Sequence, residues 1–507
     1  MIDLRSIAEI RLAEAELHAM LPDGALMQRA ATGLALACAQ ILESAGQQVA
    51  GSRVLVLVGS GNNGGDALWA AALLASRGGR VDAVCLADRV HDAGAAAVRR
   101  SGGRLVRWND GDDTLRRLVI DADLIIDGIL GIGGSGGLRP DAAGLVALVQ
   151  ASGAIVVAVD VPSGVDADTG EVAGAAVSAD ITVTFGAVKS GLLLAPGALN
   201  AGTVLLVDIG LEFAEPSRAH ATESIDVAEW VPEPAADDYK YRRGVVGVSA
   251  GSVAYPGAAL LAMSAARRGN VGMARFLDRA DGTAALVVSH YPDVVIDGSE
   301  PDAQSRVDAW VCGPGFPGDV VDTITVRAVL AARTPVVLDA GALSIVAADA
   351  DVRMLIGQRE ATGLVTVLTP HEGEFERMFP GLLVAAGGRL AAATRAASDL
   401  RSVIVLKGPG TVIVAPDGSC FVDACGTADL GTAGSGDVLA GLLGAILAGA
   451  WAHGRRTGAD LVAATAAAVW LHGAAGRIAA AHAPVVAPDI ADAIPAAIRL
   501  ARFGDDR

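Results

Sequence analysis

The chain has 507 residues, of which 52% are hydrophobic and 19% are charged, and its net charge is −18. This length exceeds one ordinary domain, so we expect two or three domains with sizeable cores. The negative charge excludes non-specific attraction to nucleic acid or to an anionic membrane, so any phosphate must be bound by local turns and a few basic groups.

Several features bear on the compartment. The five cysteines show no C-x-x-C spacing and no metal-binding pattern with the eight histidines, which indicates reduced thiols. Charged residues interrupt every apolar run in residues 1–20, so we expect no signal peptide. The apolar run at residues 438–452 is shorter than the ~20 residues that span a bilayer, and predicts a buried helix. We therefore expect a cytoplasmic protein without a membrane partner, and a homo-oligomer of a size that the sequence leaves open.

The first 210 residues alternate apolar runs with Ala-rich stretches of helical pattern. This alternation is typical of an α/β fold with a wound parallel sheet, here a Rossmann-like one. The expected strands are residues 54–58, 81–86, 124–126, 155–159, 181–185 and 204–207.

The pattern breaks between residues 212 and 243, in an acidic segment that contains Pro216, Pro232 and Pro234. Such a segment is typical of a domain boundary. We place the domains at residues 1–220 and 221–507, and the second resumes the α/β alternation. Its expected strands are residues 245–251, 308–312, 335–339, 365–368 and 403–407.

The segment Gly-Ser-Gly-Asn-Asn-Gly-Gly-Asp at residues 59–66 joins the first strand to a helical pattern at residues 67–76. A glycine turn at a helix N-terminus binds anions, because the backbone approaches closely and the first N–H groups point at the ligand. The spacing G-x-G-x-x-G also matches the dinucleotide fingerprint, with Asp82 or Asp88 as the ribose acid.

That fingerprint does not account for Asn62, Asn63 and Asp66, side chains that bind a cation or a polar substrate. The alternative is a turn in which Asn and Asp only tolerate unusual backbone angles. Two more polar loops follow strands, at residues 127–137 and 159–166. Ligands of open parallel sheets bind at the carboxyl ends of the strands, so all three loops should meet in one crevice.

In the second half, Gly-Thr-Ala-Gly-Ser-Gly-Asp at residues 431–437 runs directly into a helical pattern. The N–H groups of Gly434, Ser435 and Gly436 would form an oxyanion cradle, with Asp437 beside it as a general base. This arrangement suits phosphoryl transfer. The chain has no Walker A sequence, which excludes a P-loop enzyme. The alternative is a plain helix cap.

The three N-terminal loops, with residues 184–189 and 207–210, resemble an NAD(P)H-hydrate epimerase domain over residues 1–220. The resemblance implies that Asp160 is the acid/base or stabilises a ring cation, although it could instead cap its turn. Lys189 is a possible second participant. A potassium ion would be held by Asn63, Asp127 and Ser163. The implied substrate contacts are Asn62, Asn63, Gly64, Gly65, Asp66, Gly131, Ile132, Gly133, Gly134, Ser135, Gly136, Gly137 and Asp160.

From about residue 237 onward, the chain resembles the ADP-dependent NAD(P)H-hydrate dehydratases of the ribokinase superfamily. The resemblance rests on residues 255–259, 311–315, 369–374, 407–411 and 431–437. It implies substrate contacts from Ala258, Gly315, His371 and Asp437. The implied ADP contacts are Lys407, Gly408, Pro409, Gly410, Thr411, Gly434, Ser435 and Gly436. Gly341 stands where the family commonly has an acid, so Mg²⁺ dependence stays open.

The two resemblances together imply a nicotinamide nucleotide repair enzyme. It would interconvert the R and S forms of hydrated NADH and NADPH, and dehydrate the S form with ADP, giving AMP and phosphate. Three alternatives remain: a small-molecule kinase fused to a nucleotide-binding regulatory domain, a nicotinamide-dependent oxidoreductase, and a non-catalytic nucleotide-binding protein. The kinase would give a phosphorylated product that persists. The oxidoreductase would show hydride transfer without nucleotide dependence, and the non-catalytic protein would bind hydrated cofactor without turnover.

Overall fold

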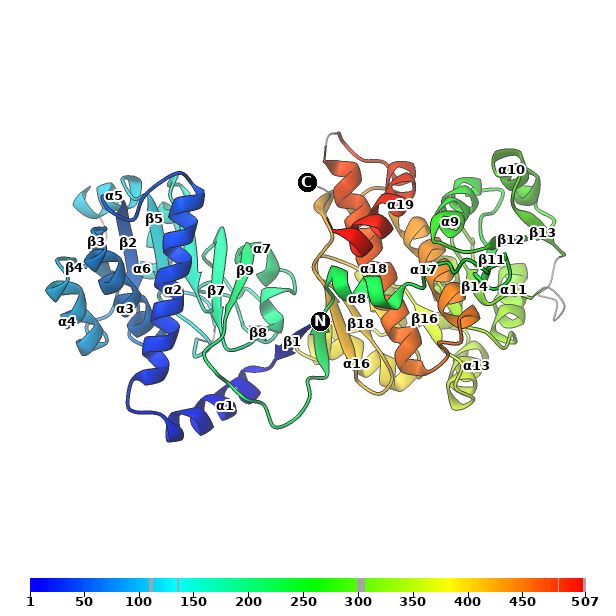
Figure 1. Ribbon diagram of the computed structural model, residues 1–507. Helices are drawn as coiled ribbons and strands as arrows, with labels where there is room; N and C mark the ends of the chain where they lie inside the picture. The colour runs from blue at the N-terminus through cyan, green and yellow to red at the C-terminus, as the bar shows by residue number, and fades with distance from the viewer. Residues whose placement is uncertain (109–112, 135, 299–305, 482, 505–507) are drawn as a thin grey trace. The chain divides into compact units, whose positions relative to one another are not determined.

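The structure is a computed structural model that describes residues 1–108, 113–134, 136–298, 306–481 and 483–504 (Figure 1). It divides into two compact units, Asp3–Ser217 and Arg218–Arg507, the second of which includes Met1–Ile2. Both units are mixed α/β structures, which confirms the predicted fold class.

The N-terminal unit contains a seven-stranded parallel sheet in the order β4-β3-β2-β5-β6-β7-β9. The strands are β2 (Arg53–Val58), β3 (Arg80–Cys85), β4 (Arg104–Arg107), β5 (Leu124–Gly128), β6 (Ile155–Val159), β7 (Ile181–Phe185) and β9 (Thr203–Val207). The helices are α1 (Ile7–Met20), α2 (Ala25–Ser44), α3 (Asn62–Ser76), α4 (Asp92–Arg100), α5 (Asp113–Ile120), α6 (Pro140–Gln150), η1 (Ser190–Leu192) and α7 (Gly197–Ala201).

Helices cover both faces of this sheet. Val54, Val56 and Val58 of β2 pack in one apolar cluster with α2 and α3, whereas Leu55 and Leu57 pack in another with α5 and α6. Successive side chains of a strand point to opposite faces, so a strand buried on both faces is apolar throughout. The unit is therefore a three-layer sandwich, and Figure 1 shows α2 running along one face.

A short parallel pair lies outside that sheet. β1 (Ile2–Arg5) pairs with β8 (Val188–Lys189), with Leu4 opposite Val188 and Arg5 opposite Lys189. Helix α1 begins immediately afterwards, at a capping box in which Ser6 and Glu9 bond each other's backbone N–H groups. Such a box satisfies N–H groups that the helix cannot, so the position of α1 is tied to the strand before it.

The C-terminal unit has its strands in the order β13-β12-β11-β14-β15-β16-β17-β18-β19-β10. They are β10 (Ala219–Ala221), β11 (Val245–Ser249), β12 (Met273–Leu277), β13 (Val295–Asp297), β14 (Ala309–Cys312), β15 (Val336–Leu338), β16 (Thr366–Leu368), β17 (Val403–Leu406), β18 (Thr411–Val414) and β19 (Cys420–Asp423). The pairs from β13 to β17 are parallel, and β18 runs antiparallel to both neighbours.

The helices of this unit form two layers. They are α8 (Ser224–Trp230), α9 (Pro256–Arg268), α10 (Thr283–His290), α11 (Val320–Leu330), α12 (Gly341–Ala348), α13 (Ala350–Ala361), α14 (Glu372–Met378), α15 (Leu382–Ala385), α16 (Arg389–Leu400), η2 (Ala428–Leu430), α17 (Ser435–Ala452), α18 (Gly458–Ala480) and α19 (Ala487–Phe503). Val403 and Val405 join the apolar cluster of α9, α17, α18 and α19. Ile404 and Leu406, which are also buried, do not, so they face the other side, where α16 packs.

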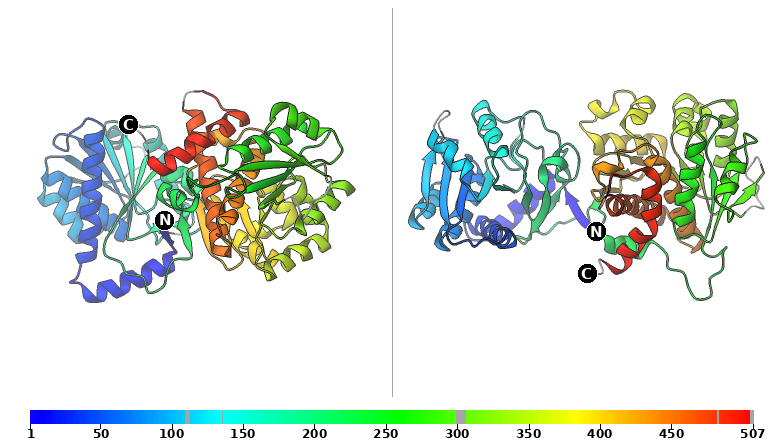
Figure 2. Two further views of the ribbon diagram at one scale, coloured as in Figure 1. Left: turned by 45° about the vertical axis from the view of Figure 1, so that its right-hand side comes forward. Right: turned by 90° about the horizontal axis from the view of Figure 1, so that it is seen from above.

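Among the residues that the structure describes, three helices are long and apolar enough to cross a membrane by length and composition: α2, α17 and α18. The apolar window of α2 is 50% buried inside the protein, and those of α17 and α18 are 78% and 83% buried. Helices α17 and α18 lie side by side (Figures 1 and 2). The predicted buried helix at residues 438–452 is α17.

Candidate active sites

The N-terminal unit has a cleft of about 820 Å³ at the carboxyl ends of β2, β5 and β6. The structure brings together here residues that the sequence placed in three separate loops. Those that line the cleft are Asn62, Asn63, Asp66, Gly131, Ile132, Gly133, Gly134 and Asp160. Helix α3 starts at Asn62, so it includes the polar residues that the sequence placed in the preceding turn.

Gly64 and Gly65 are buried beneath the cleft. A Cβ built on Gly64 would lie 2.4 Å from the carbonyl oxygen of Gly59, and one on Gly65 would lie 2.9 Å from Cε of Met27. Real side chains do not approach so closely. These glycines therefore let α3 begin directly under the cleft.

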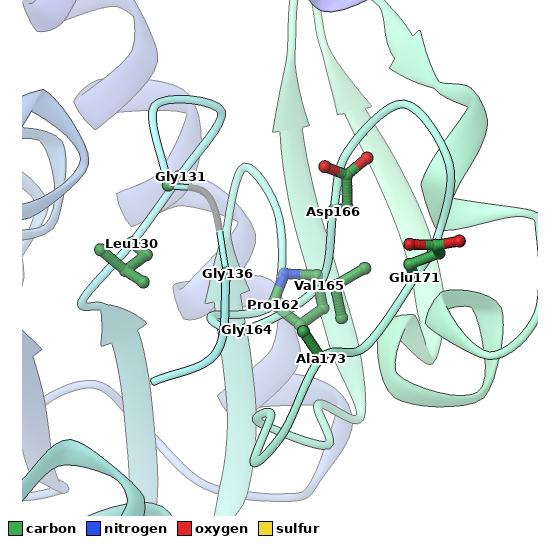
Figure 3. Close-up of a pocket in the computed structure, with 10 residues that line it drawn as sticks. Leu130, Gly131, Gly136, Pro162, Gly164, Val165, Asp166, Glu171 and Ala173 are labelled. Carbon is green, nitrogen blue, oxygen red and sulfur yellow. The ribbon is translucent and has the colours of Figure 1, made fainter. Parts of the chain in front are cut away.

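A smaller hollow of about 80 Å³ adjoins the loop of Gly131 and Gly136. Figure 3 shows it between that loop and the segment from Pro162 to Ala173. A Cβ on Gly137 would lie 3.4 Å from the carbonyl oxygen of Ala173, so both loops contribute to one wall. Ser135 lies outside the described residues.

Asp160 is a buried carboxylate held in a strained backbone conformation with φ of 66°. Its Oδ1 accepts hydrogen bonds from Nζ of Lys189 at 2.5 Å and from Oγ1 of Thr184 at 3.2 Å. The Lys189 ammonium is buried and also donates to Thr184 Oγ1 and to the carbonyl oxygen of Phe185. Strain of this kind is concentrated at functional sites. Since no described residue bonds Oδ2, that oxygen is the one available to a ligand.

Asp66 is the second acid of the cleft. Its Oδ1 is buried without a hydrogen-bond partner among the described residues. Burial, and then the negative charges of Asp160 and Glu14, raise the pKa of Asp66 well above its usual value. An unpaired carboxyl group out of water favours its neutral form, so Asp66 is suited to donate a hydrogen bond to the substrate.

Helix α1 contributes Arg11, Glu14 and His18 to the lining of the same cleft, and sequence reasoning missed all three. They are spaced i, i+3 and i+7, which places them on one face of a helix. This row of polar residues on one helix face was the sequence feature that could have indicated a role for α1 in the site. Arg11 donates to the carbonyl oxygen of Ile132 at 3.1 Å, which links α1 to the glycine loop.

Asp127 and Ser163 lie together but beneath the cleft, both fully buried. Ser163 donates from Oγ and from its amide to Asp127 at 2.7 and 2.8 Å, and burial raises the pKa of Asp127 to about 6. Asn63 lies beside Gly131, because a Cβ built on Gly131 would lie 2.8 Å from its Oδ1, and the amide of the preceding Leu130 donates to Ser163 Oγ at 2.8 Å. Carboxylate, hydroxyl and amide oxygens suit a hard cation, so the donor types fit potassium. Within the described residues, no group of three or more His, Cys, Asp and Glu side chains could hold a metal ion.

In the C-terminal unit, α17 starts after Gly434, which has φ of 89°. The first N–H groups of a helix have no carbonyl within it to bond, and at this end the Ser435 amide makes only a 3.3 Å contact with the Thr432 oxygen. His472 lies beneath: its Nε2 is 3.0 Å from the Ser435 carbonyl oxygen and 3.2 Å from Oγ. Burial lowers the pKa of His472 to about 4. The neutral ring thus donates from Nε2, because a carbonyl oxygen can only accept. His472 is 37 residues from Ser435, and no local pattern pointed to it.

Asp437, in the first turn of α17, receives no hydrogen bond from the described residues. Burial and the nearby Asp339 raise its pKa to about 6, while Lys407 acts in the opposite direction. The Lys407 ammonium lies 2.9 Å from Asp339 and 3.8 Å from Glu374. Burial alone would lower the pKa of Lys407, but these carboxylates outweigh it and raise the value. Lys407 therefore lies among carboxylates, beside the position where donor phosphates were expected.

The loop that follows Lys407 is supported from below by Arg389, which donates to the carbonyl oxygens of Leu406 and Lys407 at 3.2 Å. Gly408 needs its glycine, because its φ is 152° and a Cβ would lie 2.7 Å from the Arg389 guanidinium. Thr411 closes the loop with a 3.0 Å bond to the Gly408 oxygen. Pro409 and Gly410 lie between these two positions.

The remaining predicted residues fall in two places. Ala258 and Gly315 adjoin each other, since a Cβ on Gly315 would lie 2.7 Å from the Ala258 Cβ. His371 caps α14: its Nδ1 accepts from the amides of Gly373 and Glu374 at 3.0 and 3.3 Å. Its backbone bridges to Lys407, so the cap is next to the carboxylate cluster and its ring is exposed.

Comparisons with known proteins agree with this geometry. A family model described as NAD(P)H-hydrate dehydratase matches residues 246–496, and one described as YjeF-related protein N-terminus matches residues 23–191. The bifunctional NAD(P)H-hydrate repair enzyme Nnr of Mycobacterium leprae is 44% identical over 447 residues, covering 87% of this chain and 88% of the relative. That of Corynebacterium glutamicum is 34% identical, covering 97% of each chain.

A crystal structure of an ADP/ATP-dependent NAD(P)H-hydrate dehydratase from Bacillus subtilis, co-crystallised with ATP and Mg²⁺, is also similar. It is 29% identical, covers 56% of this chain and 98% of its own, and has a TM-score of 0.46. The relatives of full length carry both halves in one chain, as this protein does. The chain belongs to the family of bifunctional NAD(P)H-hydrate repair enzymes.

Proposed function

We propose that this protein repairs NADH and NADPH that have added water to the nicotinamide ring. The N-terminal unit interconverts the R and S hydrates, and the C-terminal unit dehydrates the S form with ADP, giving AMP and phosphate. The observation that carries this proposal is that each unit has its own acid/base group at a phosphate-type loop. These groups are Asp160 bound to Lys189, and Asp437 in the first turn of α17.

The hydrate carries its hydroxyl on ring carbon 6, next to the ring nitrogen. That carbon loses its configuration when the ring opens or when the hydroxyl leaves and the nitrogen lone pair forms an iminium ion. Lys189 holds Oδ1 of Asp160, so Oδ2 is free to exchange a proton with the hydroxyl or to stabilise the ring cation. Both epimers form in solution, whereas a chiral dehydratase pocket accepts one, which explains why two activities share one chain.

Dehydration needs a better leaving group than hydroxide. Asp437 takes the proton of the carbon 6 hydroxyl, whose oxygen then attacks the terminal phosphorus of ADP and releases AMP. The N–H groups of Gly434, which caps α17, and of Ser435 and Gly436 in its first turn stabilise the charge of the transferring phosphoryl group. The ring nitrogen lone pair then expels phosphate, and loss of a proton from the ring restores the double bond. With a pKa of about 6, Asp437 is ionised at neutral pH and can act as the base.

Two cations belong to the proposal. Mg²⁺ binds one or two carboxylates together with substrate phosphates; the second oxygen of Glu374, which no described residue bonds, fits this role, although position 341 supplies no acid. When bound, the ion would neutralise charge on the donor phosphates. Potassium would be held by Asn63, Asp127 and Ser163, and would order the loops that grip the substrate.

The test uses chemically hydrated NADH, separated into its epimers. Without nucleotide, the protein should interconvert them, as chromatography would show. With ADP, the S form should regain dihydronicotinamide absorbance while AMP and phosphate appear in equal amounts, and a parallel run with ATP would rank the two donors. A phosphorylated product that persists would instead indicate the kinase, and absorbance recovery without nucleotide would contradict the phosphoryl-transfer route. A homo-oligomer and a cytoplasmic location stay predictions, which the mass in solution and cell fractionation would check.

A further inference from the structure

Helix α1 lies outside the residues that the N-terminal family model matches, which begin at residue 23, yet it forms part of the cleft. Three anchors fix its position. β1 pairs beside Lys189, the Ile7 amide donates to Asp168 at 2.8 Å, and Arg11 donates to the carbonyl oxygen of Ile132 at 3.1 Å. Side chains on the inner face of α1 are therefore held at the site rather than free in solvent.

Glu14 is on that inner face. Its side chain is half-buried and lines the same cleft as Asp66 and Asp160. Burial and the charge of Asp160 raise the pKa of Glu14, while Lys189 and Arg11 act in the opposite direction. Glu14 thus shares the cleft with the carboxyl groups of Asp66 and Asp160, and the buried ammonium of Lys189 is bonded to Asp160. Since one ammonium balances one carboxylate, the others favour a state in which a proton is retained.

Epimerisation through the iminium ion needs such a proton. When the hydroxyl leaves carbon 6, it must be protonated to depart as water; when water adds to the other face, it must lose a proton. Asp160, held by Lys189 through Oδ1, serves one of these steps, because one carboxylate cannot give and take a proton on both faces within the same turnover. A second acid/base group is required.

We infer that Glu14 is that second catalytic acid/base group of the epimerase. Its protonated carboxyl group gives a proton to the hydroxyl, the C6–O bond breaks to release water, and the ring nitrogen lone pair forms the C=N bond of an iminium ion. Water then adds to the other face, forming a new C6–O bond and giving its excess proton to Asp160. Glu14 ends ionised and Asp160 protonated, so exchange with solvent resets the pair and the reverse epimerisation uses the opposite states.

This inference rests on the proposed function, and the test separates the two. Full-length Glu14→Gln and Glu14→Asp are compared with Glu16→Gln, a matched control on the exposed face of the same helix. Each protein is assayed without nucleotide from a single purified epimer across pH, and in H₂¹⁸O to follow the carbon 6 hydroxyl. Denaturant unfolding of each variant checks that the N-terminal unit is folded, because ADP-dependent dehydration of the S form reports on the C-terminal unit alone.

Glu14→Gln should lower kcat for epimerisation about 10²- to 10⁴-fold, with KM changed by less than about threefold. It should also remove one limb of the bell-shaped pH profile, while Glu14→Asp keeps both limbs. The parent and Glu16→Gln should gain one ¹⁸O per inversion. A Glu14→Gln enzyme with both limbs and a rate within about threefold of Glu16→Gln, or inversion without ¹⁸O, would overturn the inference. A parent that does not interconvert the epimers would overturn the proposed function itself.

Discussion

Phe316 fills the space beside Gly341: a Cβ built on Gly341 would lie 2.2 Å from the Phe316 carbonyl oxygen and 2.6 Å from the Phe316 Cβ. The Phe316 ring is held in turn by the Arg279 guanidinium, 3.9 Å from its centroid. Arg279 pairs with the buried Asp322 and donates to the Gly251 oxygen. The chain therefore has glycine at this position because the neighbouring loop occupies the space of a side chain.

Gly341→Asp should therefore destabilise the protein rather than provide a metal ligand. Overpacking in a filled site costs about 1–3 kcal/mol of folding stability. The contact here is with backbone atoms, which cannot move away by a change of rotamer. Denaturant unfolding would measure the loss, with Gly458→Ala as control, since nothing lies within 4 Å of a Cβ at Gly458. Equal stability of Gly341→Asp and parent, or dehydration that reaches half its maximal rate at a lower Mg²⁺ concentration than in the parent, would contradict this account.

Asp437→Asn should lower ADP-dependent dehydration about 10²- to 10⁴-fold, the usual effect of removing a general base. Asn keeps the side-chain shape but cannot accept a proton at neutral pH, so ADP and substrate binding should persist. In the parent, the rate should rise with pH through about 6, where the carboxyl group of Asp437 ionises. Steady-state kinetics with direct ADP-binding measurements would decide, and a rate within about threefold of the parent would leave Asp437 a structural cap.

Lys407→Met should move that pH dependence to higher pH. The ammonium lowers the pKa of Asp437, so its removal raises the pKa and delays ionisation of the base. The measurement is the pH profile of kcat at saturating ADP, which separates this effect from weaker ADP binding. Arg395→Met is a suitable control, because Arg395 is exposed and pairs within α16. An unchanged profile would mean that Lys407 serves the donor phosphates alone.

Asp127→Ala should weaken epimerisation and abolish any preference for potassium. It removes the one charged ligand of the proposed cation site and three hydrogen-bond contacts, from Ser163 and the Ile129 amide. Asp127→Asn, which keeps the shape, distinguishes loss of charge from loss of packing. Epimerisation is compared in KCl and NaCl at equal ionic strength, with dehydration unaffected throughout. Parent activity that is equal in both salts would count against the ion.

Asp423→Asn should be most stabilising at neutral and higher pH. Burial raises the pKa of Asp423 to about 7, above its unfolded value of about 3.9. Between these values the folded state binds more protons than the unfolded state, so this group's contribution to stability falls as pH rises through the window. The variant should gain up to about 4 kcal/mol relative to the parent between pH ~4 and pH ~7.5, at about 1.4 kcal/mol per pKa unit. Denaturant unfolding at both pH values would show it; a pH-independent difference would refute the shift.

Much of the fold could be predicted because its signals are local. The apolar runs at residues 155–159 and 181–185 coincide with β6 and β7, since a strand buried on both faces is apolar at every position. The glycine turns that precede α3 and α17 likewise lie next to the helices they begin. Loops at the carboxyl ends of parallel strands converge by topology alone, which is why Asn63 and Asp160 could be placed in one crevice.

The undetected residues depend on distant contacts. Glu14 belongs to a charged helix that looks solvent-exposed in sequence, and contacts with residues far along the chain, such as the pairing of β1 with β8, bring it to the cleft. His472 is in an Ala-rich helix with no sign that its ring reaches Ser435. The partners of Lys407 are Asp339, which follows β15, and Glu374 in α14. The acid that the resemblance led us to seek at position 341 is excluded by Phe316.

The pairing of β1 with β8 also sets an order of events during synthesis. Residues 2–5 leave the ribosome before their partner strand, which carries Lys189 and emerges only after the intervening chain has been made. At ~5–20 residues per second, synthesis of the intervening chain takes roughly 10–40 s. During this time the loops that form the cleft with α1 are incomplete. The epimerase should therefore become active only after β8 has been made and β1 has paired with it. If translation stalled before β8 was made, helix α1 would remain exposed to chaperones and proteases.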